Sequence, residues 1–390
     1  MPYLDYNATT PVDPEVLEAM LPWLGPRFGN PSSDYPLGRS ARQALDESRD
    51  RILRCLGARS GRIIFTGCGT EANNLALLGT FLPRLSLPDA KLSESDRGGH
   101  LIIGAIEHSA TARCAAHLAS LGFSVTEIGV DGHGLVDPDA IERAIRPDTR
   151  LVSIMHANNE VGSIQPLSDI AKRLKSKGIL FHTDAAQTLG KIPVDVETLG
   201  VDLLSLTGHK FYAPKGIGAL WVREGVVLSP ILWGGGQEQG LRSGTENVAF
   251  AVGMATALQK VHLRVAVSQT HLKSLRERLW EGLVARLGER VRRTGDPART
   301  LPNTLHVCLR NLKGHDILHG IPEVQASTGS ACHAGIDRPS SVLVAMGYPK
   351  EWSLGAIRMS LGWATTAEEV DDAAQRMAET VLKLAAARSV

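Results

Sequence analysis

The sequence predicts an α/β protein, with a mostly parallel sheet in a large domain and a smaller α+β domain after it. From about residue 60 to 225, short runs rich in Ile, Val and Leu alternate with stretches of helical period, a pattern typical of an α/β unit. Residues 248–287 contain no proline and predict one long helix. From residue 292 onward, strand-like runs precede a terminal helix, as in an α+β domain.

Short apolar runs mark the expected strands, because strands covered on both faces are continuously apolar. These runs are residues 62–66, 101–104, 151–155, 178–181, 201–206 and 218–222 for the large sheet, and 303–307 for the smaller domain. Residues 367–386 predict the terminal helix. The mostly polar segment between residues 83 and 100 predicts a surface excursion without chemistry.

Composition favours a small-molecule substrate. The chain has 390 residues, of which 43% are hydrophobic and 21% charged, and its 42 Lys and Arg nearly balance its 41 Asp and Glu. The resulting charge of +1 gives no electrostatic case for nucleic-acid or membrane binding. Neither a basic region followed by an apolar run at the start nor an uninterrupted apolar stretch of 18 residues is present, so we expect a cytoplasmic protein.

The five cysteines are odd in number and scattered, without a Cys-x-x-Cys pair. This argues against a disulfide framework and against a zinc site, so we expect reduced thiols and no metal. Cys55, Cys114 and Cys308 stand among apolar or helical residues and predict buried, inert thiols. Whether Cys68 is buried or chemically active is left open by the sequence, because this residue lies beside a glycine turn.

A carboxylate and an amine, Asp184 and Lys210, each follow an apolar run and stand 26 residues apart. Strand, helix, strand spacing would bring both to the same edge of a parallel sheet. Pyridoxal 5'-phosphate needs these two groups, an amine for its aldehyde and an acid for its ring nitrogen. Alone, Lys210 would be interpreted as a surface lysine; beside Asp184, Gln187 and His209 it indicates a cofactor site.

A glycine turn over residues 67–74 follows the first expected strand and opens a helix. Free backbone N–H groups and the helix dipole hold anions at such a position, and the Thr70 hydroxyl adds a donor. A purely structural turn explains the same glycines equally well. Because this glycine turn directly follows an expected strand, we take a phosphate site there as the working hypothesis.

Three further polar positions follow expected strands or turns. His108 can stack its imidazole on a flat pyridine ring, although a lone histidine more often has a local hydrogen-bonding role. Asn159 and Gln187 carry amides that can donate to the phenolate oxygen of a cofactor or to a substrate carboxylate, with turn or cap roles as the alternative. The polar loop over residues 242–247 can reach a neighbouring subunit's phosphate in a dimer, or form only a turn.

The ordered series of motifs resembles class V, fold-type I pyridoxal-phosphate enzymes of the cysteine desulfurase and selenocysteine lyase group, over nearly the whole chain. The motifs are residues 4–11 (LDYNATTP), 29–33 (GNPSS), 69–71 (GTE), 107–108 (EH), 158–160 (NNE), 182–187 (HTDAAQ), 208–210 (GHK) and 242–245 (RSGT). The resemblance implies a seven-stranded type of sheet, a large domain over residues 15–255, a small domain from residues 1–14 and 256–390, and a homodimer.

The resemblance also implies roles for the polar residues. Lys210 would bind the cofactor, Asp184 would face its ring nitrogen, and His108 would stack and take part in catalysis. Asn159 and Gln187 would face the phenolate side, with Asn159 near the substrate as well. The phosphate would be held by Gly69, Thr70, Thr207, His209 and the partner subunit's Thr245.

Cys332 lies in a run of small residues, 326–335, which is unlike a packed helix or core strand and predicts a thiol on a mobile arm. In the family that it resembles, such a cysteine attacks the substrate sulfur, leaves alanine, and carries a persulfide to an acceptor protein. His333 next to it would lower the pKa of the thiol if the two side chains touch.

Arg358, between Ile357 and Met359, predicts an inward charge that pairs with a substrate α-carboxylate, with a surface salt bridge as the alternative. Thr207 and Trp363 stand where a serine and a basic residue are frequent in the family. A cysteine desulfurase, a selenocysteine-selective lyase, a same-fold aminotransferase and a non-catalytic sulfur-assembly scaffold therefore stay open. The polar segment near residues 84–99 and the Ala-Cys-His sequence favour selenium slightly.

Overall fold

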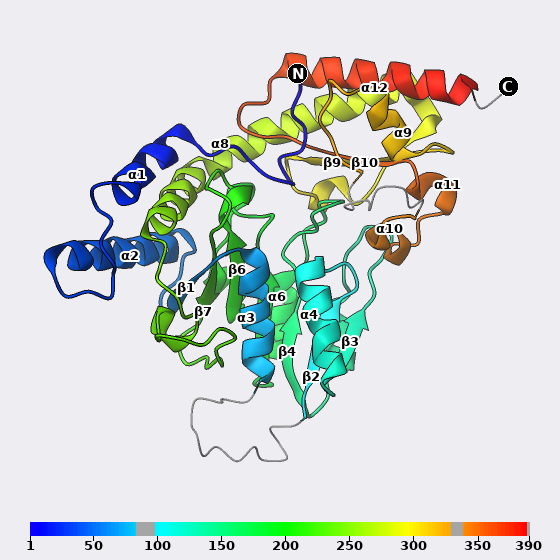
Figure 1. The fold of residues 1–390 in the computed structure, drawn as a ribbon. Helices are drawn as coiled ribbons and strands as arrows, with labels where there is room; N and C mark the ends of the chain where they lie inside the picture. Colours follow the sequence, from blue (N-terminus) through cyan, green and yellow to red (C-terminus); the bar gives the residue numbers. More distant parts are fainter. Residues whose placement is uncertain (83–97, 329–337, 388–390) are drawn as a thin grey trace.

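A computed structural model of the chain describes residues 1–82, 98–328 and 338–387. Its centre is a seven-stranded sheet in the order β1-β7-β6-β5-β4-β2-β3, with helices on both faces (Figure 1). The strands are β1 Arg62–Thr66, β2 His100–Gly104, β3 Ser124–Ile128, β4 Thr149–Ser153, β5 Leu180–Asp184, β6 Leu203–Thr207 and β7 Gly218–Val222. Five of them, β3, β2, β4, β5 and β6, are parallel, and β7 runs antiparallel to both of its neighbours. The expected α/β class with a mostly parallel sheet is confirmed.

The helices that cover and extend this sheet begin at prolines, glycines or capping residues. The helices are α1 Pro14–Leu24, α2 Pro36–Cys55, α3 Gly69–Phe81, α4 Ser109–Ser120, α5 Pro138–Ala144, α6 Leu167–Leu174, α7 Val196–Leu199, α8 Val248–Leu287, α9 Gly314–His319, α10 Ser341–Ala345, α11 Lys350–Ser353 and α12 Ala367–Ala387. None of these described helices is long and apolar enough to cross a membrane.

Strand ends differ from the expected runs because polar residues extend them. The run predicted over residues 178–181 becomes β5, which starts after the turn at Gly178 (φ 68°) and continues through His182 to Asp184. His182 is buried between strands, and its two ring nitrogens contact the hydroxyls of Ser153 (2.8 Å) and Ser205 (2.9 Å). Burial lowers the pKa of His182 to about 4, so the imidazole is neutral. Polar residues paired in this way fit a core strand without breaking it.

A second sheet, β10-β9-β8, is antiparallel and consists of β8 Val291–Arg293, β9 Thr304–Leu309 and β10 Ala356–Ser360. The helices α8, α9 and α12 pack over it (Figure 1). The first residues of the chain join this sheet through bridges between Tyr3 and Gln325 and between Asp5 and Ser360. The N-terminal segment is thereby held between the two sheets.

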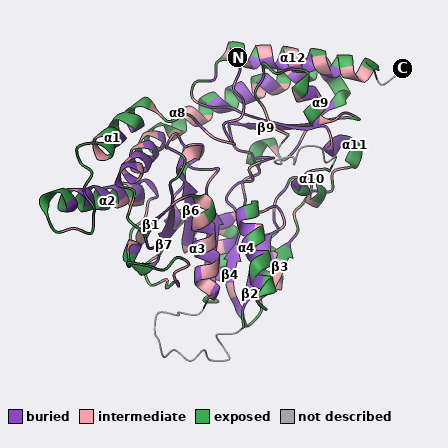
Figure 2. Cartoon of the chain, viewed as in Figure 1, coloured by how far each residue is buried: buried purple, intermediate pink, exposed green. Residues whose placement is uncertain are grey.

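The long helix predicted over residues 248–287 is confirmed as α8, which is capped at Asn247 by a bond from the Phe250 amide to the Asn247 side chain (3.1 Å). Its first part, up to Val261, belongs to the core beneath the large sheet, and its residues from Leu272 onward belong to the core of the second sheet. Figure 2 shows buried residues, in purple, along this helix. The expected domain boundary at residues 255 and 256 falls inside this continuous helix, and the division into domains stays a prediction.

The ends of β1 and β6 lie on either side of Gly218 in β7. Thr66 of β1 and Thr207 of β6 both pair with this glycine. Gly218 has no side chain, so the backbone of Cys68 passes directly beside it. A Cβ atom at Gly218 would lie 2.5 Å from the carbonyl carbon of Cys68. The start of α3 is therefore fixed against the segment that carries Lys210.

Replacing Gly218 by alanine should displace this start of α3, because a backbone atom cannot rotate out of the way. We expect a loss of stability of about 1–3 kcal/mol, measured by denaturant unfolding. Gly129→Ala is the matched control, since nothing lies within 4 Å of a Cβ atom there. Equal stability of the two variants would contradict the expectation.

Candidate active site

A pocket of about 630 Å³ opens where the parallel strands end, beside the N-terminal segment and β10. Ten residues that the sequence singled out line this one pocket, although they come from six separate segments. They are Gly69, Thr70, His108, Asn159, Asp184, Gln187, Thr207, His209, Lys210 and Arg358. The fold therefore brings together nearly all of the expected site.

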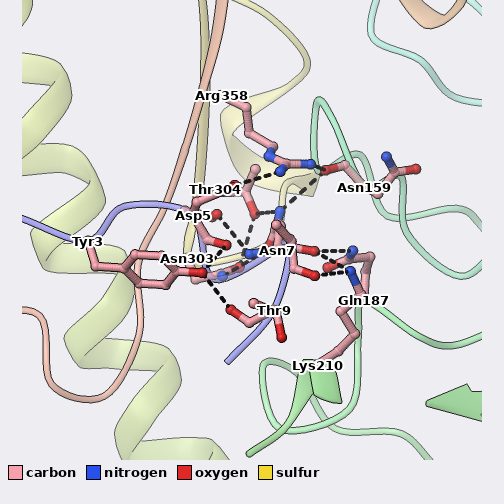
Figure 3. A network of polar contacts seen from close by, with 12 residues as sticks. Tyr3, Asp5, Asn7, Thr9, Asn159, Gln187, Lys210, Asn303, Thr304 and Arg358 are labelled. Atoms are coloured by element: carbon pink, nitrogen blue, oxygen red, sulfur yellow. Dashed lines mark hydrogen bonds and ion pairs between the residues drawn. The ribbon is translucent and has the colours of Figure 1, made fainter. Parts of the chain in front are cut away.

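Lys210 ends a short 3-10 turn directly after β6. Its Nζ donates to the backbone oxygens of Asn7 (2.6 Å) and Ala8 (2.7 Å) (Figure 3). Burial, followed by the positive charge of Arg358, lowers the pKa of Lys210 to about 8, although Asp5 and Asp184 act in the opposite direction. A substantial fraction of this amine is thus uncharged and nucleophilic near neutral pH.

Asp184 is the last residue of β5 and is almost fully buried. One carboxylate oxygen accepts from Asn73 Nδ2 (2.7 Å) and the other from the backbone N–H of Ala186 (2.9 Å). These bonds fix the plane of the carboxylate at the pocket wall. Asn73 is buried in α3, and the sequence interpretation assigned no role to it beyond its place near the GTE motif.

The start of α3 presents the N–H groups of its first turn, which have no acceptor within the helix, to the pocket. Thr207 packs against this turn, since a Cβ atom on Gly69 would lie 3.0 Å from Thr207 Cβ. His209 contacts Thr9 Oγ1 through its Nδ1 (3.2 Å). Burial and the nearby Lys210 lower the pKa of His209 to about 4, so its imidazole is neutral.

His108 caps α4, where its Nδ1 accepts from the N–H of Ala110 (3.1 Å). An accepting Nδ1 leaves the proton of the neutral ring on Nε2. The adjacent Glu107 accepts from the N–H of Met155 (2.8 Å) through one oxygen, while its other oxygen is buried without a hydrogen-bond partner among the described residues. Burial raises the pKa of Glu107 well above its usual range. The pocket therefore contains a buried carboxyl group with a raised pKa, to which the sequence interpretation assigned no role.

Arg358 lies at the middle of β10 and is 4% exposed, so the expected inward charge is observed. Its two terminal nitrogens donate to the backbone oxygen of Asn159 (2.8 Å) and to the carboxylate of Asp5 (2.6 Å) (Figure 3). Its Nε is buried without a partner in the described chain. Asp5 was not anticipated, because nothing in the local sequence links it to a strand 353 residues away.

Gln187 donates from Nε2 to the backbone oxygen of Asn7 (3.0 Å) and accepts at Oε1 from Lys191 Nζ (2.7 Å). Asn7 lies at the centre of these contacts and is fully buried (Figure 3). The sequence interpretation assigned no role to Asn7 beyond its place in the LDYNATTP motif, and none to Lys191. Only the folded chain brings the N-terminal segment to the pocket.

The sequence pattern of the family described as "Aminotransferase class-V" matches residues 2–372. The chain belongs to this family. Members of the class-V aminotransferase family depend on pyridoxal 5'-phosphate.

This class-V family member is 44% identical over 371 residues to "Cysteine desulfurase IscS" of Dictyoglomus turgidum, covering 95% of this chain and 91% of that protein. Its fold is similar to that of a solved "NifS-like protein", with a TM-score of 0.88, 36% identity, and coverage of 98% of this chain and 99% of the other. It is also similar to the structure "SspA in complex with cysteine", with a TM-score of 0.79, 36% identity, and coverage of 93% and 99%. The fold-type I architecture is therefore shown.

One predicted site residue of this class-V family member, Thr245, does not line the pocket, and another, Cys332, lies outside the described residues. Thr245 is exposed in the loop before α8, outside the pocket lining. Its neighbour Arg242 pairs with Glu71 of α3 (2.8 Å). Cys332, together with His333, lies outside the described residues, as does most of the polar segment that begins at residue 83.

The described thiols of this class-V family member divide into buried and exposed ones. Cys55, Cys114 and Cys308 are buried, as expected. Burial raises their pKa values to about 11, 12 and 12, so these three thiols stay protonated at neutral pH. Cys68 is exposed and lines the pocket beside the start of α3. It is the described thiol that has access to a molecule in the site.

Proposed function

We propose that this chain is a pyridoxal-phosphate-dependent cysteine desulfurase, which removes sulfur from L-cysteine and leaves L-alanine. The observation that carries the proposal is the Lys210 amine, with its lowered pKa, in one pocket with the fixed carboxylate of Asp184. Membership in the class-V family and the 44% identity to a protein named cysteine desulfurase support it.

The residues of the pocket fit pyridoxal 5'-phosphate. The first turn of α3, with Thr70, Thr207 and His209, offers N–H and hydroxyl donors for a phosphate. Asp184 offers a carboxylate for the ring nitrogen. His108 offers a flat ring, and the amides of Asn159 and Gln187 offer donors on the opposite side. When bound, the cofactor supplies an electron-withdrawing ring conjugated with the substrate.

The side chains of the chain then perform the steps that involve binding and protons. Arg358 orients the substrate through its α-carboxylate, and the backbone oxygen of Asn159 and Asp5 hold the guanidinium in place. The amine of Lys210, with its pKa of about 8, takes the Cα proton and later returns one. Its bonds to Asn7 and Ala8 hold Nζ at the pocket wall between these events.

The sulfur step is assigned to Cys332, which lies outside the described residues. Its thiolate attacks the substrate sulfur, an S–S bond forms as the C–S bond breaks, and the released carbon is protonated to give alanine. The resulting persulfide passes to a thiol of an acceptor protein. The small residues around Cys332 support this assignment, because carrying sulfur away requires the thiol to move.

We further propose that two copies of the chain form a homodimer, in which Thr245 reaches the phosphate site of the neighbouring subunit. Its exposure outside its own pocket supports this role. The cytoplasmic location stays a prediction from the sequence.

The substrate choice between sulfur and selenium is decided in favour of cysteine in this proposal. One similar protein is named a cysteine desulfurase, and one similar structure was solved in complex with cysteine. This outweighs the slight preference for selenium that the sequence segment near residues 84–99 suggested.

One assay tests the proposal: alanine and sulfide formation from L-cysteine, and alanine and selenide from L-selenocysteine, with wild type and Cys332→Ala. We expect the variant to keep the cofactor and lose at least about 10³-fold in sulfide release, because the sulfur has no nucleophile. Cys68→Ala tests the described thiol that lines the pocket and should keep most of the activity. Full cysteine activity in Cys332→Ala would contradict the desulfurase assignment, and alanine formation only with an added keto acid would indicate an aminotransferase.

A further inference from the structure

Lys191 is a second lysine near the site, and the mechanism above does not use it. It follows the turn at Gly190 (φ 76°) and is 6% exposed. Its Nζ donates to Asn7 Oδ1 (2.8 Å) and to Gln187 Oε1 (2.7 Å). Both acceptors are neutral amide oxygens, and the charges that act on Nζ in the described structure, Lys210 and Arg358, are positive. Burying a lysine in such surroundings is costly, which calls for a compensating role.

The two contacts of Lys191 determine which way two side-chain amides face. An amide can turn its oxygen or its NH₂ group toward a neighbour, and the Nζ of Lys191 donates to the oxygen of each of these two amides. Lys191 therefore selects the oxygen end of both amides. The NH₂ group of Gln187 is then directed to the backbone oxygen of Asn7 (3.0 Å), and that of Asn7 to Thr304 Oγ1 (2.9 Å). Asn303 supports the same orientation by donating to Asn7 Oδ1 (3.1 Å).

The orientation matters because the backbone oxygen of Asn7 has a second donor. It accepts from Gln187 Nε2 and, at 2.6 Å, from Lys210 Nζ (Figure 3). Lys191 thus bonds directly to Gln187 and Asn7, and Asn7 in turn bonds to the reactive amine of Lys210. If Lys191 could not donate, Gln187 could rotate and aim its oxygen into the pocket, where a cofactor phenolate would be repelled.

We propose that Lys191 is a positioning residue: its two hydrogen bonds hold the NH₂ end of Gln187 toward the cofactor side of the pocket and keep the Asn7 backbone oxygen in contact with Lys210. The proposal rests on the proposed function only in that it takes pyridoxal 5'-phosphate as the cofactor. It concerns the binding of this cofactor and the environment of Lys210, and both can be measured without turnover of cysteine.

The first test is Lys191→Met, which keeps the length of the side chain and removes the donor. Titration of the apoprotein with pyridoxal 5'-phosphate should show about tenfold weaker binding, the loss expected for one hydrogen bond of about 1.4 kcal/mol. The pH midpoint of the visible absorption of the loaded protein should shift by at least about half a unit, since the donors and charges around Lys210 change. The other charged groups that act on Lys210 are Arg358, Asp5 and Asp184, and all three remain.

Lys260→Met is the matched control. Lys260 is also largely buried and donates to two oxygens, those of Asp13 and Glu15, both at 2.7 Å, but it does not line the pocket. We expect this control to lose stability while its pH midpoint and cofactor affinity stay at the wild-type values. A Lys191→Met protein that behaves in the same way as the control would overturn the proposal and leave Lys191 a structural residue.

A double-mutant cycle with Gln187→Ala tests whether Lys191 acts through this amide. The double variant should bind pyridoxal 5'-phosphate no more than about threefold weaker than Gln187→Ala alone, because the amide that Lys191 orients is already gone. Fully additive losses would overturn the proposed route. Should Lys191→Met fail to fold, Lys191→Gln, which keeps a donor, is measured in the same way and should restore part of the affinity that Lys191→Ala loses. Wild-type protein that binds the cofactor but does not desulfurate cysteine would contradict the proposed function and leave this test intact.

Discussion

Lys210→Ala is expected to lower kcat/KM for cysteine by at least about 10³-fold and to abolish the visible absorption of the lysine-bound cofactor. Both results follow from one atom, because Nζ is at once the amine for the aldehyde and the base for the Cα proton. Its two backbone contacts, with Asn7 and Ala8, hold it in the pocket but do not neutralise its charge. Spectra of the purified variant after incubation with pyridoxal 5'-phosphate, together with an alanine assay, check the expectation.

The control for Lys210→Ala is Lys215→Ala, an exposed lysine five residues later in the same segment. It should keep the wild-type colour and activity. The wild-type apoprotein also allows a pH test, because a lysine with a pKa of about 8 reacts slowly as its charged form below that pH. The rate of reaction with pyridoxal 5'-phosphate should therefore rise with pH and level off above about 8. A rate that keeps rising toward pH 10 would show that Lys210 has an ordinary pKa.

Asp184→Asn is expected to lower kcat by on the order of 10²-fold while the cofactor still binds. The amide has nearly the shape of the carboxylate, so β5 should keep its structure, but its negative charge is lost and the ring nitrogen loses the partner that keeps it protonated. Asn73 would also face an amide in place of a carboxylate oxygen. Steady-state kinetics with cysteine and the absorption spectrum of the loaded protein measure the two effects separately.

Asp202→Asn is the matched control for this substitution. Asp202 accepts from the N–H of Phe181 (2.9 Å) and pairs with Arg223 (3.3 Å), at the opposite ends of β5 and β6 from Asp184. Its loss should reduce stability and leave the absorption spectrum and kcat close to those of wild type. Equal kinetic losses in the two variants would show that Asp184 acts only through the sheet.

The sequence predicted those parts of the protein that depend on neighbours along the chain. Apolar runs located β1 and β7, and a proline-free stretch located α8. The start of α3 was predicted by glycines after a strand, since a helix that begins there leaves its first N–H groups free. In β5 the pattern was incomplete, because His182 is polar in sequence and only its serine partners on two neighbouring strands explain its burial.

The site residues that the sequence did not reveal are those whose partners lie far along the chain. Asn7, Asp5 and Lys191 have ordinary local surroundings. The contact of Asn7 with Lys191 spans 184 positions of the chain, and that of Asp5 with Arg358 spans 353. Glu107 is next to a candidate, His108, but the raised pKa of its carboxyl group follows from its burial in the folded chain. Periodicity and spacing report on one element at a time, so contacts between elements had to come from the three-dimensional structure.

The position of the N-terminal segment also depends on a strand that lies far along the chain. Asn7 receives Lys210 at its backbone oxygen, and its own N–H donates to Ser360 Oγ (2.9 Å), while Asp5 bridges to the same serine backbone. Asn7 is therefore held in place by a residue of β10, 353 positions further along the chain. A chain shortened before β10 would lose this contact and, with it, the fixed position of the backbone oxygen that accepts from Lys210.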